Sequence, residues 1–115
     1  MTLEKEVKEL RELQNDIAKK QNTQAQLTAQ LKENELVKQE LELVEDESNI
    51  YKLIGPVLVK QDKQEAVANV GKRIDFIQNE LKRLNEFMEK QVKAQAEKRK
   101  VVLDLQAKLQ QQQAS

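Results

Sequence analysis

The stretch Ile50-Tyr51-Lys52-Leu53-Ile54-Gly55-Pro56-Val57-Leu58-Val59-Lys60 decides the fold of this chain. Two short runs of β-branched and other apolar residues are divided by Gly55-Pro56, and glycine next to proline marks a turn. The stretch therefore predicts a β-hairpin over residues 50–60. Such a hairpin has only two strands, which is marginal in water, and its apolar side chains would lie on unpaired edges.

We therefore expect the hairpin to pair with strands of other chains. The alternative is that it folds back on the ends of its own flanking segments. The residues expected to carry the assembly are the apolar and aromatic ones, namely Ile50, Tyr51, Leu53, Ile54, Val57, Leu58 and Val59.

A helical pattern precedes the hairpin. Apolar residues spaced by threes and fours, without glycine or proline, predict a helix over residues 2–46. These residues are Leu3, Val7, Leu10, Ile17, Leu27, Leu31 and Leu41. The acidic run that begins at Glu45 suits a helix C-terminus badly, so we expect the helix to end there, with Asn49 as a candidate cap.

A second helical pattern follows the hairpin, over residues 63–112. Asp62 and Glu65 have the spacing of a capping box, which begins a helix. A heptad seam then continues without a phase break through Val67, Val70, Ile74, Ile77, Leu81, Leu84, Met88, Gln91, Gln95, Lys98, Val102, Leu105, Leu109 and Gln112. Gly71 interrupts a good helical sequence, and it either permits a close backbone approach or is merely tolerated.

The two helical patterns match each other when they are folded about Gly55-Pro56. This arrangement sets Leu3 opposite Leu109, Val7 opposite Leu105, Leu10 opposite Val102, Leu31 opposite Leu81, Gln14 opposite Lys98 and Gln21 opposite Gln91. In these pairs apolar residues meet apolar residues and polar residues meet polar ones. Two further pairs are mixed, with Ile17 opposite Gln95 and Gln24 opposite Met88. The predicted fold is mainly α: a long antiparallel two-helix coiled coil with one β-hairpin at the bend, in a single domain over residues 1–115.

Some apolar residues near the two chain ends lie off the predicted seam. Leu13, Val101 and Leu103 are the clearest, and Leu103 should point outward if Val102 and Leu105 face the other helix. Isolated exposed apolar residues are also ordinary on protein surfaces. The alternative to that ordinary explanation is a small apolar patch at the tip of the coiled coil, which would bind non-native protein.

The composition excludes several kinds of function. The 115 residues contain no histidine and no cysteine, so neither a catalytic triad nor the usual zinc ligand sets can form. We expect no enzymatic activity, no metal and no cofactor. The net charge is zero and no apolar run is long enough to span a membrane, so binding to nucleic acid or membrane is not expected.

The chain resembles the β class of the prefoldin family. The resemblance is carried by Asn34-Glu35-Leu36-Val37-Lys38-Gln39-Glu40-Leu41, by Tyr51-Lys52-Leu53-Ile54-Gly55-Pro56-Val57-Leu58-Val59-Lys60-Gln61, and by Glu65-Ala66 with Val70-Gly71-Lys72-Arg73-Ile74. It implies a heterohexamer of two α-class and four β-class subunits, whose hairpins join into a double β-barrel. It further implies an ATP-independent, cytoplasmic co-chaperone.

The resemblance also implies partners and sites. Such a complex captures unfolded clients, notably actin and tubulin, at its coiled-coil tips and passes them to the cytosolic group II chaperonin. The tip residues of this chain would be Leu3, Val7, Leu10, Leu13, Val101, Val102, Leu103 and Leu105. Two other functions remain open. One is a coiled-coil scaffold that tethers folded partners, and the other is a helical hairpin that binds nucleic acid, for which Lys98-Arg99-Lys100 is the only compact basic run.

Overall fold

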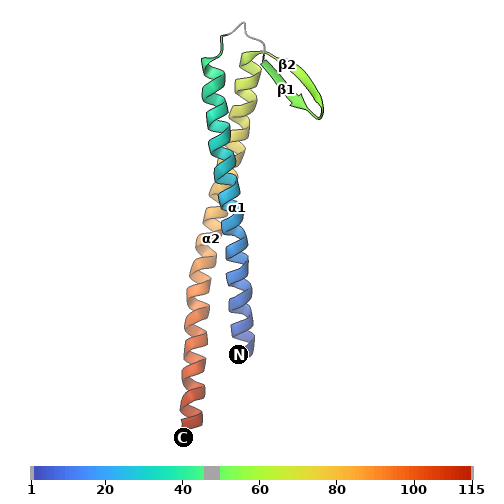
Figure 1. Ribbon diagram of the computed structural model, residues 1–115. Coiled ribbons are helices and arrows are strands. Elements are labelled where there is room, and N and C mark those ends of the chain that lie inside the picture. Colours follow the sequence, from blue (N-terminus) through green and yellow to red (C-terminus); the bar gives the residue numbers. More distant parts are fainter. Residues whose placement is uncertain (1, 46–49, 115) are drawn as a thin grey trace. The chain divides into compact units, whose positions relative to one another are not determined.

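Along the chain, one long helix precedes a β-hairpin and a second long helix follows it (Figure 1). The computed structural model describes residues 2–45 and 50–114. In chain order the elements are α1 (Leu3–Leu43), β1 (Ile50–Ile54), β2 (Val57–Gln61) and α2 (Lys63–Ala114). The predicted fold class is thereby confirmed. The expected cap at Asn49 lies outside the described residues.

Each helix begins at a side chain that caps it. The hydroxyl oxygen of Thr2 accepts a hydrogen bond from the backbone N–H of Lys5 at 3.3 Å. The carboxylate of Asp62 accepts one from the backbone N–H of Glu65 at 2.7 Å, as the capping-box spacing predicts. Since the first N–H groups of a helix have no partner within it, these bonds define where α1 and α2 start.

The hairpin is closed by the two residues between Ile54 and Val57, which are partners in the antiparallel ladder. Gly55 has a φ of 57°, and proline at position 56 cannot adopt a positive φ. A positive φ at only the first central residue is the pattern of a type II′ turn, which matches the twist of the strands it joins. The Gly55-Pro56 dipeptide therefore fixes both the turn and the register of β1 against β2.

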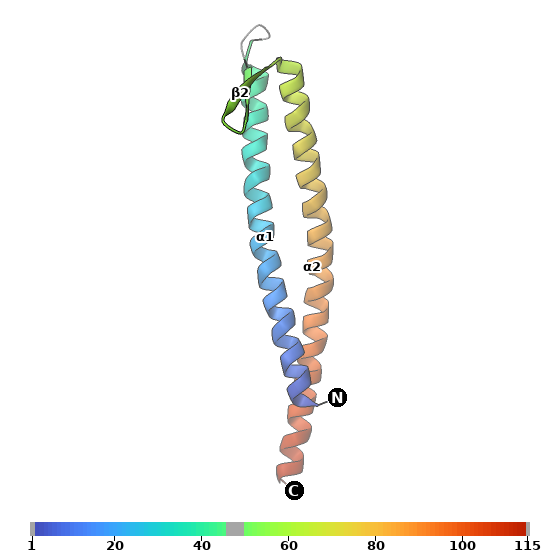
Figure 2. The ribbon, with the colours of Figure 1, turned by 90° about the vertical axis from the view of Figure 1, so that its right-hand side faces the viewer.

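The chain divides into two compact units, which we name by their contents. The terminal unit combines Met1–Ala25 with Arg83–Ser115, and the hairpin unit comprises Gln26–Lys82. Within the terminal unit the first residues of α1 and the last residues of α2 lie at the same end (Figure 2). The helices are antiparallel there, because Gln24 bonds Asn85 while Glu6 bonds Lys98.

Both units bury a narrow seam rather than a broad core. In the terminal unit the buried residues are Glu6, Ile17, Gln91 and Val102, and in the hairpin unit they are Ala66, Val70, Ile74 and Ile77. Five of these residues lie at positions of α2 that the heptad pattern predicts, namely Val70, Ile74, Ile77, Gln91 and Val102. Among the described residues, neither helix carries a stretch apolar enough to cross a membrane.

Candidate functional site

The hairpin presents its apolar side chains to solvent. The exposed fraction ranges from 41% for Val59 to 67% for Leu53, and Tyr51, Ile54, Val57 and Leu58 fall between these values. Ile50, at the start of β1, is half-buried. Six of the seven residues predicted to carry assembly are therefore exposed within this chain. Exposed apolar side chains gathered on one short hairpin are typical of a protein interaction site.

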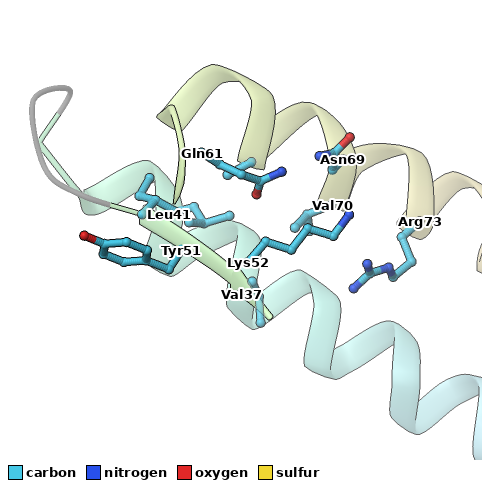
Figure 3. A pocket seen from close by; sticks show the side chains of 10 residues that line it. Val37, Leu41, Tyr51, Lys52, Gln61, Asn69, Val70 and Arg73 are labelled. Atoms are coloured by element: carbon cyan, nitrogen blue, oxygen red, sulfur yellow. The ribbon is translucent and has the colours of Figure 1, made fainter. Parts of the chain in front are cut away.

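A hollow of about 210 Å³ lies where β1 meets the adjoining ends of α1 and α2 (Figure 3). We call it the hairpin hollow. Its apolar lining comes from both helices and from the start of β1, and its polar lining includes Lys52 on β1 and Arg73 on α2. All the residues that line it are Val37, Leu41, Ile50, Tyr51, Lys52, Gln61, Ala66, Asn69, Val70 and Arg73.

A second hollow, of about 340 Å³, lies among residues near the two chain ends in the terminal unit. We call it the terminal hollow. It is lined by Thr2, Leu3, Leu105, Lys108, Leu109 and Gln112. It contains Leu3 and Leu105, two of the residues predicted for the tip, together with Leu109, which the sequence assigned only to the seam.

The other predicted tip residues differ in exposure. Leu103 is 57% exposed on α2, which agrees with its expected outward direction. Val102 is buried, so it contributes to helix pairing rather than to an open surface. The half-buried members of the predicted tip are Leu3, Val7, Leu10, Leu13, Val101 and Leu105.

Several exposed apolar residues were not assigned to a site from the sequence. Leu109 is 42% exposed at the terminal hollow. In the hairpin unit Leu36, Leu43 and Phe76 are all more than half exposed. The signal that could have identified Leu36 and Leu43 is their spacing of one heptad, off the seam that contains Leu41.

Lys98 links the two helices of the terminal unit. Its Nζ donates hydrogen bonds to Oε2 of Glu6 at 2.8 Å and to Oε2 of Glu9 at 2.5 Å. These bonds to Glu6 and Glu9 raise the pKa of Lys98, and the bond from Lys98 lowers the pKa of Glu9. The sequence sets Gln14 opposite Lys98, but the hydrogen bonds of Lys98 go to Glu6 and Glu9, because a long cationic side chain reaches along the helix to carboxylates.

A second polar layer is built around Gln91. Its Nε2 donates a hydrogen bond to Oδ2 of Asp16, which also accepts one from Lys20 at 2.6 Å. The hydrogen bond from Lys20 lowers the pKa of Asp16 most, and the hydrogen bond from Gln91 lowers it further. Oε1 of Gln91 is buried and has no hydrogen-bond partner among the residues that the structure describes. The expected pairing of Gln91 with Gln21 is wrong, since Gln21 is exposed and Asp16 takes its place.

Lys20 completes this layer by contacting an aromatic ring. Its Nζ lies 4.8 Å from the ring centre of Phe87, within the range of a cation–π interaction. On the next turns Gln24 donates to Asn85 at 2.6 Å. The terminal unit thus contains several polar contacts between its helices. Among the described residues, no group of acidic side chains gathers in a way that could hold a metal ion.

Comparison with known proteins gives a consistent picture. The family of prefoldin subunits matches residues 4–114. Prefoldin subunit 6 of Arabidopsis thaliana is 49% identical over 108 residues, which cover 94% of this chain and 84% of that protein. Prefoldin subunit 6 of Homo sapiens is 40% identical over 113 residues, which cover 98% of this chain and 88% of that protein.

A solved structure shares the fold. The crystal structure of the prefoldin beta subunit from Thermococcus strain KS-1 superposes with a TM-score of 0.82, over 89% of this chain and 90% of that one, at 20% identity. The resemblance to β-class subunits is confirmed. Residues 55–61 and 70–73 also predict a likeness to the sixth subunit of eukaryotic prefoldin, and the overall identity to subunit 6 of Arabidopsis thaliana and Homo sapiens agrees with that prediction.

Proposed function

Since this chain belongs to the family of prefoldin subunits, a family that forms hetero-oligomeric chaperone complexes, we propose that it captures unfolded proteins without catalysing a reaction. In this proposal the hairpin joins the chain to other α- and β-class subunits in a heterohexamer. The chain ends hold the client, and the complex delivers it to the cytosolic group II chaperonin in the cytoplasm.

The exposed hairpin is the observation that carries the assembly part of the proposal. Leu53 and Leu58 are cross-strand partners, and each is more than 60% exposed. Burial of an apolar side chain of this size contributes about 1.5–3 kcal/mol. Covering the six exposed hairpin residues therefore supplies a large driving force, which only another chain or another segment can provide.

The terminal unit carries the client part. Leu103 and Leu109 are both exposed on α2 and lie less than two helical turns apart. Leu109 lines the terminal hollow together with Leu3 and Leu105. The terminal hollow and the separate exposed leucine offer apolar contacts. Such a surface suits unfolded chains, whose side chains arrive in no fixed order. Actin-like and tubulin-like clients are the proposed class.

Assembly and client binding can be tested in one system. The chain replaces human subunit 6, to which it is 40% identical, in a mixture with the remaining human prefoldin subunits. We expect it to co-purify with them in one hetero-oligomer by size-exclusion chromatography and native mass spectrometry. We expect that hetero-oligomer to suppress the aggregation of actin diluted from denaturant, as measured by light scattering.

A pair of variants separates client binding from assembly. Leu103→Ser with Leu109→Ser should leave assembly intact and weaken suppression of aggregation several-fold. Val92→Ser is the control, because Val92 is a similarly exposed apolar residue elsewhere on α2. Full protection of actin by the Leu103/Leu109 variant would remove these residues from the client site. Assembly without any protection of unfolded actin would favour the alternative function, a scaffold for folded partners.

A further inference from the structure

We propose that the hairpin hollow receives an extended, acidic segment of a different subunit, whose carboxylates lie against Lys52 and Arg73. This inference rests on the proposed function, because it names the chemistry of the partner that the hairpin meets. Three observations support it: the charge of the hollow, the open edge of β1 and the absence of acidic residues from the hairpin itself.

The hollow combines an apolar floor with a cationic rim. Val37 and Leu41 of α1 and Val70 of α2 line its apolar part, while Lys52 and Arg73 supply two positive charges. Among the residues that the structure describes, none that lines it is acidic. In Figure 3 the side chain of Lys52 extends across the hollow toward α2, the helix that carries Arg73. A ligand with apolar and acidic side chains in alternation would satisfy both parts.

The edge of β1 favours an extended ligand. Ile54 and Val57 flank the two-residue turn, so they form a hydrogen-bonded pair, and the pairs alternate from there along the ladder. The backbone groups of Leu53 and Tyr51 consequently point away from β2. Tyr51 also lines the hollow, so this free edge borders it. A strand added to the edge would place every second side chain on the same face as the hollow.

Charge also distinguishes the occupant from a second copy of this chain. The hairpin residues 50–61 include Lys52 and Lys60 but no aspartate or glutamate. Two copies pairing through their hairpins would bring lysines together without a carboxylate between them. Because like charges across an interface disfavour association, pairing between two hairpins of this chain is disfavoured, and a partner that brings acidic residues to the hollow is favoured.

Two synthetic peptides provide a direct test on the full chain. One is the heptapeptide Val-Glu-Val-Glu-Val-Glu-Val and the other has lysine in place of glutamate, both with blocked ends. The chain contains one tyrosine and no tryptophan, so its tyrosine emission reports on Tyr51 at the hollow. We expect the acidic peptide to bind at least tenfold more tightly, and we expect the difference to shrink as sodium chloride screens the charges.

Matched variants locate the binding. Lys52→Gln and Arg73→Gln should each weaken binding of the acidic peptide about three- to fivefold, as expected for exposed ion pairs. Lys60→Gln is the control, because it removes an equally exposed hairpin cation that does not line the hollow. Equal affinity for the two peptides, no binding of either, or an equal effect of Lys60→Gln would each overturn the proposal.

The oligomeric state of the isolated chain tests whether a second copy of this chain occupies the hollow. If the chain forms a dimer in sedimentation, and Lys52→Gln or Arg73→Gln dissociates it, the hollow holds a second copy and the proposal is wrong. Assembly with the remaining human subunits separates this inference from the proposed function. If every version of the chain, including the unmodified one, fails to assemble, the proposed function fails. If all versions assemble equally well at low and high salt, only the acidic partner is refuted.

Discussion

The ammonium nitrogen of Lys98 lies 2.8 Å from Oε2 of Glu6 and 2.5 Å from Oε2 of Glu9, so one cation of α2 joins two carboxylates of α1. Glu6 is only 5% exposed. A buried charge is strongly unfavourable unless it is paired and hydrogen-bonded. Lys98 therefore supplies the partner that the buried carboxylate of Glu6 requires.

Removing the cation should destabilise the terminal unit. Lys98→Met keeps an unbranched side chain but removes the positive charge, which leaves Glu6 buried without its partner. We therefore expect Tm to fall by several degrees in far-UV circular dichroism. Lys100→Met is the matched control, because Lys100 is exposed two residues away. An equal Tm for the two variants would show that the pair contributes nothing beyond the lost surface charge.

The same contacts predict a dependence of stability on pH. The pKa values of Glu9 and Asp16 are lowered by folding, so their contribution is complete above about pH 4 and is lost as pH falls through the folded values. The pKa of Lys98 is raised by folding. Its contribution is complete below about pH 10 and is lost as pH rises through the folded value.

Thermal unfolding at a series of pH values checks this prediction. Tm should be highest between these limits and should decline on both sides. The Lys98→Met variant serves as the reference, because the part of the alkaline decline that depends on Lys98 should disappear in it. A difference between the two proteins that stays constant above pH 10 would contradict the assignment.

Replacing Gln91 with leucine should stabilise the chain. Its buried Oε1 accepts no hydrogen bond within the described part of the chain, and Asp16 keeps its bond to Lys20 when Gln91 is removed. Gln91→Leu should therefore raise the free energy of unfolding by about 1 kcal/mol in urea titrations, since it relieves an unsatisfied polar atom and adds apolar burial. A loss of stability would mean that the bond to Asp16 outweighs the unsatisfied oxygen.

Gly71→Ala distinguishes the two explanations that the sequence left open. A Cβ built at Gly71 meets no atom of the described residues within 4 Å, so packing within them requires no glycine there. The variant should stabilise the isolated chain by up to about 1 kcal/mol in urea titrations. If it also weakens assembly with other prefoldin subunits, the glycine permits a close approach by a partner. Unchanged assembly would mean that it is merely tolerated.

Gly55→Ala should have the opposite effect. The positive φ of 57° at Gly55 is unfavourable for a residue with a Cβ, by about 1–2 kcal/mol, although no atom of the described residues lies within 4 Å of that Cβ. We expect faster amide hydrogen exchange in Lys52 and Val59, which are paired across the ladder, and little change in α1 and α2. Unchanged exchange in the hairpin would show that the turn accommodates the strain.

Local signals in the sequence are sufficient to predict much of the fold. The turn at Gly55-Pro56 determined the hairpin, and Asp62 determined the start of α2, because both features depend on neighbouring residues alone. The heptads identified the buried faces at Ile74 and Ile77 for the same reason. These are properties of the backbone and of apolar periodicity, which a single sequence carries directly.

The polar contacts of the terminal unit could not be predicted in the same way. Heptad spacing placed Gln14 and Gln21 in the polar layers, but the structure uses Glu6, Glu9 and Asp16. A lysine or glutamine side chain can reach a full helical turn, about 5.4 Å along the axis, and charge rather than position selects its partner. The hollows were also missed, because each combines residues from two or more elements.

The tight turn at Gly55-Pro56 has a consequence for the order of events during assembly. Every pair in the ladder joins residues close in sequence, from Ile54 with Val57 to Ile50 with Gln61. Contacts of such short range form within microseconds, far faster than two proteins meet at cellular concentrations. A newly made chain can therefore sample its hairpin many times before any partner arrives. Partner subunits then bind a hairpin that has already formed. The rate of this binding is set by how often two subunits meet rather than by how fast the hairpin folds.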